Sequence, residues 1–258
     1  MVESRVSRRV SGAGRALDAV RGALVDFSRP GGIEVFVDAA TIDALDQMMA
    51  QQGYLDGREM GRAFRMLRSN SLIWHYFVHN YLYGETPPPF DVLYWNTDVT
   101  RMPRAMHSFY LREFYLHNKL IQQDTLKLAG HPIDLGRIRQ PLYAVGCEED
   151  HIAPWQATFK IAGKIAAPVR YTLSSSGHIL GIINPPVKPA KRSYWSGETD
   201  ADPPDDWLKH QVRIDGSWWE NWVAWLGKRC GPKVAARAPG SAEHPVLGAA
   251  PGSYVHEI

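Results

Sequence analysis

The sequence is poor in cysteine and has almost no excess of charge of either sign. Its two cysteines, Cys147 and Cys230, lie far apart and form neither a C-x-x-C pair nor a Cys/His ligand spacing. Neither a disulfide framework nor a zinc site is therefore expected, and reduced thiols are typical of a cytoplasmic protein. The formal net charge of +2 is too small to indicate nucleic acid or an acidic membrane surface as a partner.

Long apolar runs are also absent. No run approaches the roughly 20 residues that a membrane-spanning helix requires, so no such span is expected. Otherwise the composition, with 45% apolar and 22% charged residues in a chain of 258, is ordinary for a globular protein with a sizeable core. Residues 1–22 are rich in arginine and lack the apolar core of a secretory signal, and we predict a disordered start there.

Helical patterns dominate from about residue 34 to residue 130. Apolar residues at steps of three and four, with capping residues at the ends, predict helices over residues 41–52, 70–84 and 105–120. Prolines at 87–89 interrupt the pattern and leave Trp95 in a loop. Residues 23–28 have the pattern of the end of a buried strand. We therefore predict a helical insert that follows a strand and is not itself a sheet layer.

Two buried strands are predicted further along, over residues 141–146 and 169–175, joined by a helix whose first turn contains Pro154. A helical crossover returns the chain in the same direction, so the two strands should be parallel neighbours. The loops after them then open at the same carboxyl edge of the sheet, where α/β folds place their ligands. Asp150 follows the first strand and His178 the second, so we expect these two side chains to meet.

The last part of the chain combines a loop, a helix and a tail. Residues 188–207 are polar and proline-rich and predict an ordered loop. Residues 216–231 predict a helix that packs on the core through three tryptophans on one face, Trp218, Trp222 and Trp225. The Ala/Pro/Gly-rich segment from Pro232 onward predicts a loosely ordered tail.

An acid followed by a histidine fits the chain order nucleophile, acid, histidine of the α/β-hydrolases. In such a triad the histidine removes the proton from the nucleophile, and the acid orients the imidazole ring. No G-x-S-x-G or G-x-C-x-G elbow occurs before Asp150. Cys147 lies at the end of the strand that precedes Asp150 and not on a sharp turn of its own, so we expect a buried apolar thiol, with the nucleophile role as the alternative. Cys230, which follows the histidine, is a weaker candidate.

Several segments together resemble the carboxyl-terminal half of the class I poly(3-hydroxyalkanoate) synthases. They include GETPPPFDVLYWNTDVTRMP, YLREFYLHNKL, PIDLGRI, EEDHIAPW, SGHILGIINPP, KRSYW and GSWWENWVAWL, and the similarity runs from about Leu24 to the end. The resemblance implies an α/β-hydrolase core with a helical cap. It also implies an acyltransferase that polymerises (R)-3-hydroxyacyl groups from their coenzyme A thioesters, with no cofactor besides the coenzyme A of the substrate.

The resemblance also assigns roles to residues. By position, Asp150 and His178 resemble the acid and the base of the family's triad, whose cysteine lies in a G-x-C-x-G elbow. Five further residues resemble positions that line or approach the substrate cleft: Arg68, Trp95, Asp98, Asn118 and His151. Arg68 is a candidate contact for a coenzyme A phosphate. Cap packing and loop hydrogen bonds are the alternative roles for these five residues.

The elbow, and everything that precedes it in the family, has no counterpart in the sequence. We therefore expect a synthase truncated before its nucleophile and inactive alone, with a partial α/β-hydrolase domain over residues 23–232 and a tail over 233–258. One alternative is a non-catalytic subunit that forms a homo- or hetero-dimer with a synthase through the cap. Another is a hydrolase or acyltransferase that uses Cys147 with His178. The expected location is the cytoplasm, including the surface of polyhydroxyalkanoate granules.

Overall fold

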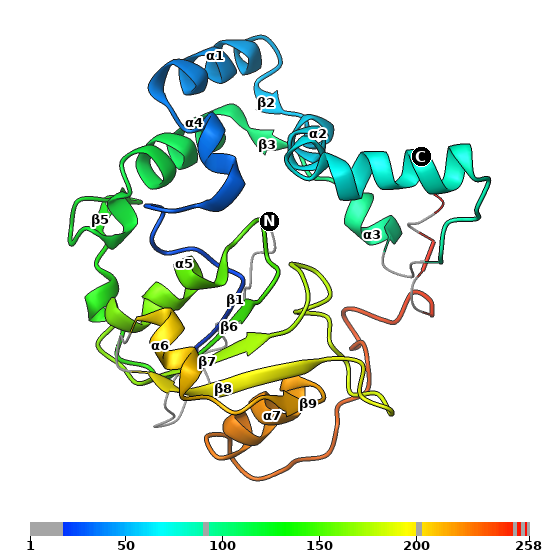
Figure 1. Ribbon diagram of the computed structural model, residues 1–258. Helices are drawn as coiled ribbons and strands as arrows, with labels where there is room; N and C mark the ends of the chain where they lie inside the picture. Colours follow the sequence, from blue (N-terminus) through cyan, green and yellow to red (C-terminus); the bar gives the residue numbers. More distant parts are fainter. Residues whose placement is uncertain (1–17, 90–92, 200–202, 250–251, 254–255, 257–258) are drawn as a thin grey trace.

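A mixed sheet of five strands, in the order β1-β6-β7-β8-β9, forms the base of the molecule (Figure 1). The computed structural model describes residues 18–89, 93–199, 203–249, 252–253 and 256. In the sheet, β1 (Asp18–Arg21), β6 (Leu142–Cys147) and β7 (Val169–Ser174) are parallel. Two further strands, β8 (Ser193–Thr199) and β9 (Ile214–Asp215), continue the sheet in antiparallel pairing.

Helices cover both faces of this sheet, which explains why every residue of β6 is buried. On one face, Leu142 and Ala144 pack with residues of α5 (Trp155–Phe159), η7 (Lys160–Gly163) and α6 (Pro204–Lys209). On the other face, Tyr143 and Val145 pack against α7 (Trp218–Gly227). Because side chains alternate along the strand, β6 contributes residues to two separate hydrophobic cores.

A helical region, residues 31–137, arches over one side of the sheet (Figure 1). Its helices are η1 (Gly31–Phe36), α1 (Ala39–Ala50), α2 (Gly57–Leu67), η2 (Asn70–Trp74), η3 (Phe77–Leu82), α3 (Leu93–Thr97), α4 (Arg104–Phe109), η4 (Tyr110–Leu116), η5 (Lys119–Ile121) and η6 (Leu135–Arg137). Its strands have two residues each and form the pairs β2 (Tyr54–Leu55) with β3 (Met102–Pro103) and β4 (Lys127–Leu128) with β5 (His131–Pro132). A small core of Met49, Leu55 and Met102 holds α1 to the β2–β3 pair.

Much of the predicted secondary structure is confirmed. The strands at β6 and β7, the helix with Pro154 at its N-cap and the tryptophan helix α7 lie where the patterns placed them. The predicted helix over 105–120 corresponds to α4 and η4 and ends at Leu116. The predicted helix over 70–84 is helical through residue 82, largely as the π-helical segments η2 and η3.

The start of the sheet corrects two predictions. A strand was predicted to end within residues 23–28, and residues 1–22 were predicted to be disordered, yet β1 occupies Asp18–Arg21. Gly22 ends this strand because it adopts a positive φ of 56°, which bends the chain away. Residues 23–28 are irregular, although Val25 and Phe27 are buried as a strand pattern requires. Residues 1–17 lie outside the described residues.

The predicted loop over residues 188–207 is also wrong, because it contains strand β8 and most of helix α6. Pairing along the whole of β7 places Ser193, Tyr194 and Thr199 in buried positions despite the polar composition of this segment. Strand formation here follows from the neighbouring strand and not from local propensity. None of the helices in the described part of the chain has the length and apolarity of a membrane span.

Candidate active site

Asp150 and His178 meet at the carboxyl edge of the sheet, as their positions after β6 and β7 predicted. Nδ1 of His178 lies 2.8 Å from Oδ2 of Asp150. The other carboxylate oxygen of Asp150 accepts hydrogen bonds from the backbone N–H groups of Ile152 and Ala153, both at 2.9 Å. The Asp150 side chain is fully buried, whereas that of His178 is 34% exposed. The acid is therefore fixed by its surroundings, and it in turn orients an imidazole that solvent can reach.

Backbone contacts between the two loops hold this geometry. The N–H of Asp150 donates to the carbonyl of Cys147 at 3.2 Å, which turns the chain back directly after β6. Glu149 donates its N–H to the carbonyl of Ser176 at 3.1 Å and so joins the loop after β6 to the loop after β7. Ser176 has a positive φ of 83°, an uncommon conformation that redirects the chain just before His178. The position of the pair thus depends on two paired strands and on a backbone hydrogen bond between the loops that follow them.

The other ring nitrogen of His178, Nε2, forms no hydrogen bond with any of the described residues. The imidazole lies beside the end of β1, because its Cε1 atom is 3.7 Å from the point where a Cβ on Gly22 would stand. β1 forms the edge of the five-stranded sheet. Among the described residues, the imidazole of His178 therefore lies at the β1 edge of the sheet.

Cys147 does not offer a thiol to this nitrogen. Its side chain is completely buried, and its Sγ lies 2.5 Å from the point where a Cβ on Gly181 would stand, so the sulfur is packed against that glycine. Burial, with a smaller contribution from the charge of Asp150, raises the pKa of the Cys147 thiol to about 12. An enclosed, protonated thiol suits core packing and not nucleophilic attack. Cys230 is exposed and follows α7.

His151 directly follows Asp150 and lies near the helical region. Burial lowers the pKa of His151, and the positive charge of Arg68 lowers it further. Arg68 is the C-cap residue of α2 and is exposed. η1 packs against the loop that carries His151, since a Cβ on Gly31 would lie 3.3 Å from the His151 carbonyl oxygen. The loop after β6 therefore contacts the helical region at His151.

Asn118 forms hydrogen bonds of the kind given above as its alternative role. Its Oδ1 accepts the N–H of Phe27, and its Nδ2 donates to Oδ1 of Asp26, both at 2.9 Å. Asp26 also forms an ion pair at 3.0 Å with Lys160 at the end of α5. Burial would raise the pKa of Asp26, but hydrogen bonds from Ser28, Lys160 and Asn118 outweigh it and lower the pKa to about 2. This network joins the sheet to the helical region.

Sequence reasoning missed Asp26 and Lys160. The only local signal for Asp26 is an acid between the apolar residues Val25 and Phe27. Trp95 and Asp98, on and just after α3, are both exposed, and within the described ranges neither forms a hydrogen bond with Asp150 or His178. The described residues contain no group of three His, Cys, Asp or Glu side chains that could hold a metal ion.

The chain is similar in sequence to known proteins over most of its length. No family model matches the chain. The chain is 43% identical over 231 residues to a poly(3-hydroxyalkanoate) polymerase of Methylorubrum extorquens, covering 90% of the chain and 38% of that protein. It is 44% identical to a poly(3-hydroxyalkanoate) polymerase subunit PhaC of Rhizobium etli and 41% identical to that of Cupriavidus necator, covering 90% of the chain and 36% and 40% of those proteins. Over nine tenths of its length the chain is therefore related to poly(3-hydroxyalkanoate) polymerases, and it spans about two fifths of the length of those relatives.

Proposed function

We propose that this chain carries the acid–base half of the active site of an acyltransferase that polymerises (R)-3-hydroxyacyl groups from coenzyme A thioesters. The observation that carries the proposal is the 2.8 Å contact between buried Asp150 and accessible His178 at the carboxyl edge of parallel strands. The relationship to polymerases over 90% of the chain supports it. The order of strand, acid, helix, strand and histidine supports a partial α/β-hydrolase fold with the helical region as its cap.

In this reaction Asp150 holds the proton on Nδ1 of His178, which leaves Nε2 as the basic nitrogen. A cysteine thiol gives its proton to Nε2, and its sulfur forms a bond with the thioester carbonyl carbon. The bond from that carbon to the coenzyme A sulfur then breaks, and coenzyme A leaves as a thiol with the proton from His178. No cofactor takes part besides the coenzyme A of the substrate.

Chain growth uses the same nitrogen a second time. The 3-hydroxyl group of an acyl unit gives its proton to Nε2, and its oxygen attacks the acyl group on the cysteine. The carbon–sulfur bond to the enzyme breaks, and the cysteine recovers the proton. Cys147 is enclosed and does not supply this sulfur in the proposed reaction. The resemblance to the synthases implies that the thiol comes from a G-x-C-x-G elbow, a motif that these 258 residues do not contain.

The exposed aromatic residues of the helical region support a second candidate role, as a partner subunit. We call residues 70–83 the aromatic arm. Five of its aromatic side chains are 43% to 75% exposed: Trp74, Tyr76, Phe77, Tyr81 and Tyr83. Contiguous apolar surface of this kind marks interaction sites. We propose that the arm pairs with a full-length polymerase.

Two proteins test the catalytic proposal: the chain alone, and a fused protein in which the chain replaces the matching part of the Methylorubrum extorquens polymerase. The assay measures free coenzyme A released from 3-hydroxybutyryl-coenzyme A. We expect release by the fused protein only, loss of release in its His178→Ala variant, and no change in His131→Ala, which removes an exposed histidine. Release by the chain alone, or by the His178→Ala fused protein, would contradict the proposal.

Co-purification tests the partner role. A tagged chain should retain the untagged polymerase of Methylorubrum extorquens, and the variant Trp74→Ser/Tyr81→Ser should retain much less of it, because both rings are exposed on the arm. His131→Ala again provides a surface control. Failure of the unaltered chain to retain the polymerase would remove this role.

A further inference from the structure

Two histidines of the aromatic arm lie side by side. His75 and His79 are four positions apart, a spacing that places side chains on the same side of a helical segment. Their ring centroids are 4.4 Å apart, and their ring planes differ by 39°. His75 is exposed, and the side chain of His79 is 40% exposed. Small ions in the solvent therefore have access to both imidazoles.

Glu85 holds one of these rings in a fixed orientation. Its Oε2 lies 2.8 Å from Nδ1 of His79. Gly84 has a positive φ of 70°, which turns the chain directly after the arm. The N–H of Glu85 then donates to the carbonyl of His79 at 2.9 Å, and Nδ2 of Asn80 donates to the carbonyl of Glu85 at 2.7 Å. These contacts bring the carboxylate of Glu85 back onto the imidazole of His79.

This arrangement leaves ring nitrogens available on both histidines. A carboxylate beside Nδ1 favours the tautomer that carries its proton there, so Nε2 of His79 keeps its lone pair. Among the described residues, neither this Nε2 nor either ring nitrogen of His75 forms a hydrogen bond. In histidine metal sites, a carboxylate behind the ring orients the imidazole and raises the basicity of the ligating nitrogen. Glu85 stands in that relation to His79.

The separation of the two rings suits a single metal ion. Zinc–nitrogen bonds of about 2.0–2.1 Å place two nitrogens of a tetrahedral site about 3.4 Å apart, which rings with centroids 4.4 Å apart can reach by small side-chain rotations. Imidazole nitrogens bind Zn²⁺, Cu²⁺ and Ni²⁺, whereas Mg²⁺ and Ca²⁺ prefer oxygen ligands. Two imidazoles supply two of the four positions and leave two for water, in keeping with the absence of any three-ligand group from the described residues.

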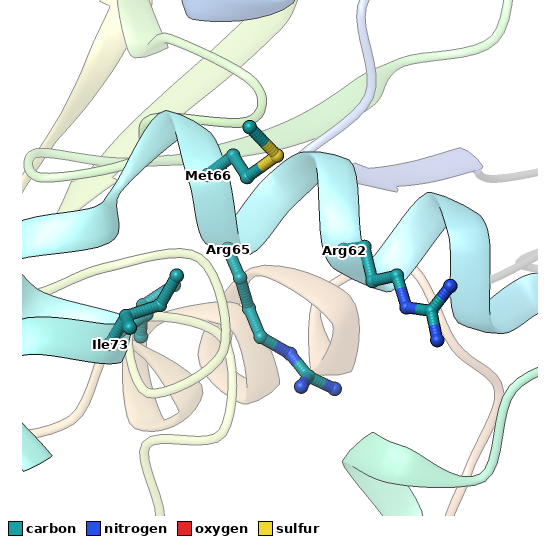
Figure 2. A pocket seen from close by; sticks show the side chains of 5 residues that line it. Arg62, Arg65, Met66 and Ile73 are labelled. Carbon is teal, nitrogen blue, oxygen red and sulfur yellow. The ribbon is translucent and has the colours of Figure 1, made fainter. Parts of the chain in front are cut away.

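The hollow beside the start of the arm offers no such ligands. It is lined by residues of α2 and of the first turn of the arm: Arg62, Arg65, Met66, Leu72 and Ile73 (Figure 2). None of these side chains is an imidazole, a thiolate or a carboxylate, and the two guanidinium groups repel a cation. A metal ion on the arm is therefore expected at the two histidines and not in this hollow.

We propose that His75 and His79 bind a divalent transition-metal ion of the zinc and copper class, with Glu85 orienting His79. Both ligands belong to one helical segment, so a bound ion links successive turns of the arm and stabilises them. The site shares no residue with the Asp150–His178 pair, and metal binding there does not depend on the catalytic proposal. Protons compete with the metal for imidazole nitrogens, so binding weakens in acid.

Calorimetric titration of the full chain with zinc chloride at pH 7.5 tests the site. We expect zinc to bind more tightly than magnesium, and zinc binding to weaken when the titration is repeated at pH 5.5. Glu85→Gln should weaken zinc binding about tenfold, because an amide orients the ligating imidazole less well than a carboxylate does. Unchanged zinc affinity in Glu85→Gln would contradict the role of Glu85.

A variant that exchanges two side chains tests the spacing of the pair. His75→Phe/Phe77→His keeps the composition of the chain but moves one imidazole to two positions from His79, where the rings no longer share a side of the helix. This variant should bind zinc more weakly by about tenfold or more. The control His131→Ala removes an exposed histidine outside the arm and should change the affinity less than about twofold.

Two results would overturn the proposal. One is equal zinc affinity of the unaltered chain and His75→Phe/Phe77→His. The other is an equal loss of affinity in His75→Phe/Phe77→His and His131→Ala, because zinc would then bind exposed histidines without regard to their spacing.

Discussion

The carboxyl edge of the sheet and the aromatic arm differ in the kind of side chain that they bury: the edge buries a charged side chain, and the arm exposes apolar ones. At the edge, the charged side chain of Asp150 is fully buried, and both of its carboxylate oxygens accept hydrogen bonds. On the arm, apolar rings face solvent, and Trp74 is 56% exposed. The edge thus holds a fixed acid–histidine pair, whereas the arm leaves apolar rings exposed. In the function proposed above, chemistry and association therefore belong to different parts of the chain.

The largest expected effect concerns the edge. In the fused protein, Asp150→Asn should lower the rate of coenzyme A release by about 10³- to 10⁴-fold, because an amide no longer fixes the proton on Nδ1 of His178. The exposed Asp205 provides the control, and Asp205→Asn should leave the rate unchanged. A loss of less than about tenfold would mean that Asp150 only supports the loop and does not set the tautomer of His178.

The next prediction compares two tryptophans, one buried in the core and one exposed on the aromatic arm. Trp225→Ala should lower the free energy of unfolding by about 3 to 5 kcal/mol, because Trp225 is 6% exposed and packs in the core under α7. Trp74→Ala on the arm should change it by less than about 0.5 kcal/mol. Urea unfolding of both variants measures the difference. A large loss for Trp74→Ala would show that the arm is part of the folded core and not a free surface.

A smaller and pH-dependent effect is expected at the junction of the sheet and the helical region. The pKa of Asp26 is lowered from 3.8 to about 2, so the folded state favours its ionised form. The stability that this adds is present above about pH 4 and is lost as the pH falls toward 2. Asp26→Asn should therefore cost about 2 kcal/mol at pH 7 and progressively less below pH 4.

Urea unfolding at pH 7, 4 and 3 measures this difference between Asp26→Asn and the unaltered chain. The control is Asp205→Asn, whose effect should be close to zero at each pH, since that carboxylate is exposed. A difference for Asp26→Asn that stays constant from pH 7 to pH 3 would show that the ionised carboxylate of Asp26 does not stabilise the junction through its charge.

The last effect is of similar size and concerns the packing of Cys147. Gly181→Ala would place a methyl group 2.5 Å from the Cys147 sulfur, and it should destabilise the fold by about 1 to 3 kcal/mol. Adding Cys147→Ala should recover part of this loss by removing the sulfur, although the carbonyl oxygen of Gly177 at 2.8 Å and the retained Cβ of residue 147 at 2.9 Å still oppose the methyl group. Purely additive losses in the double variant would show that the thiol does not pack against Gly181.

The sequence predicted the catalytic pair because its signals are local. β6 and β7 are short buried runs, and their loops carry Asp150 and His178 directly after them. The contacts of Asn118 and the strand β8 were out of reach, because both depend on partners distant along the chain. Asn118 bonds to residues 91 and 92 positions away, and β8 forms by pairing with β7. Local sequence patterns thus predicted the acid–histidine pair, whereas the structure around it depends on contacts between residues far apart in the chain.

In the proposed reaction, His178 acts as the base for a thiol outside these 258 residues. The most direct test is the pH dependence of alkylation of the elbow cysteine by iodoacetamide in the fused protein. An imidazole that accepts the thiol proton should move the midpoint well below the ordinary thiol pKa of about 8.5, and His178→Ala should return it to about 8.5. Identical profiles for the fused protein and its His178→Ala variant would contradict the claim.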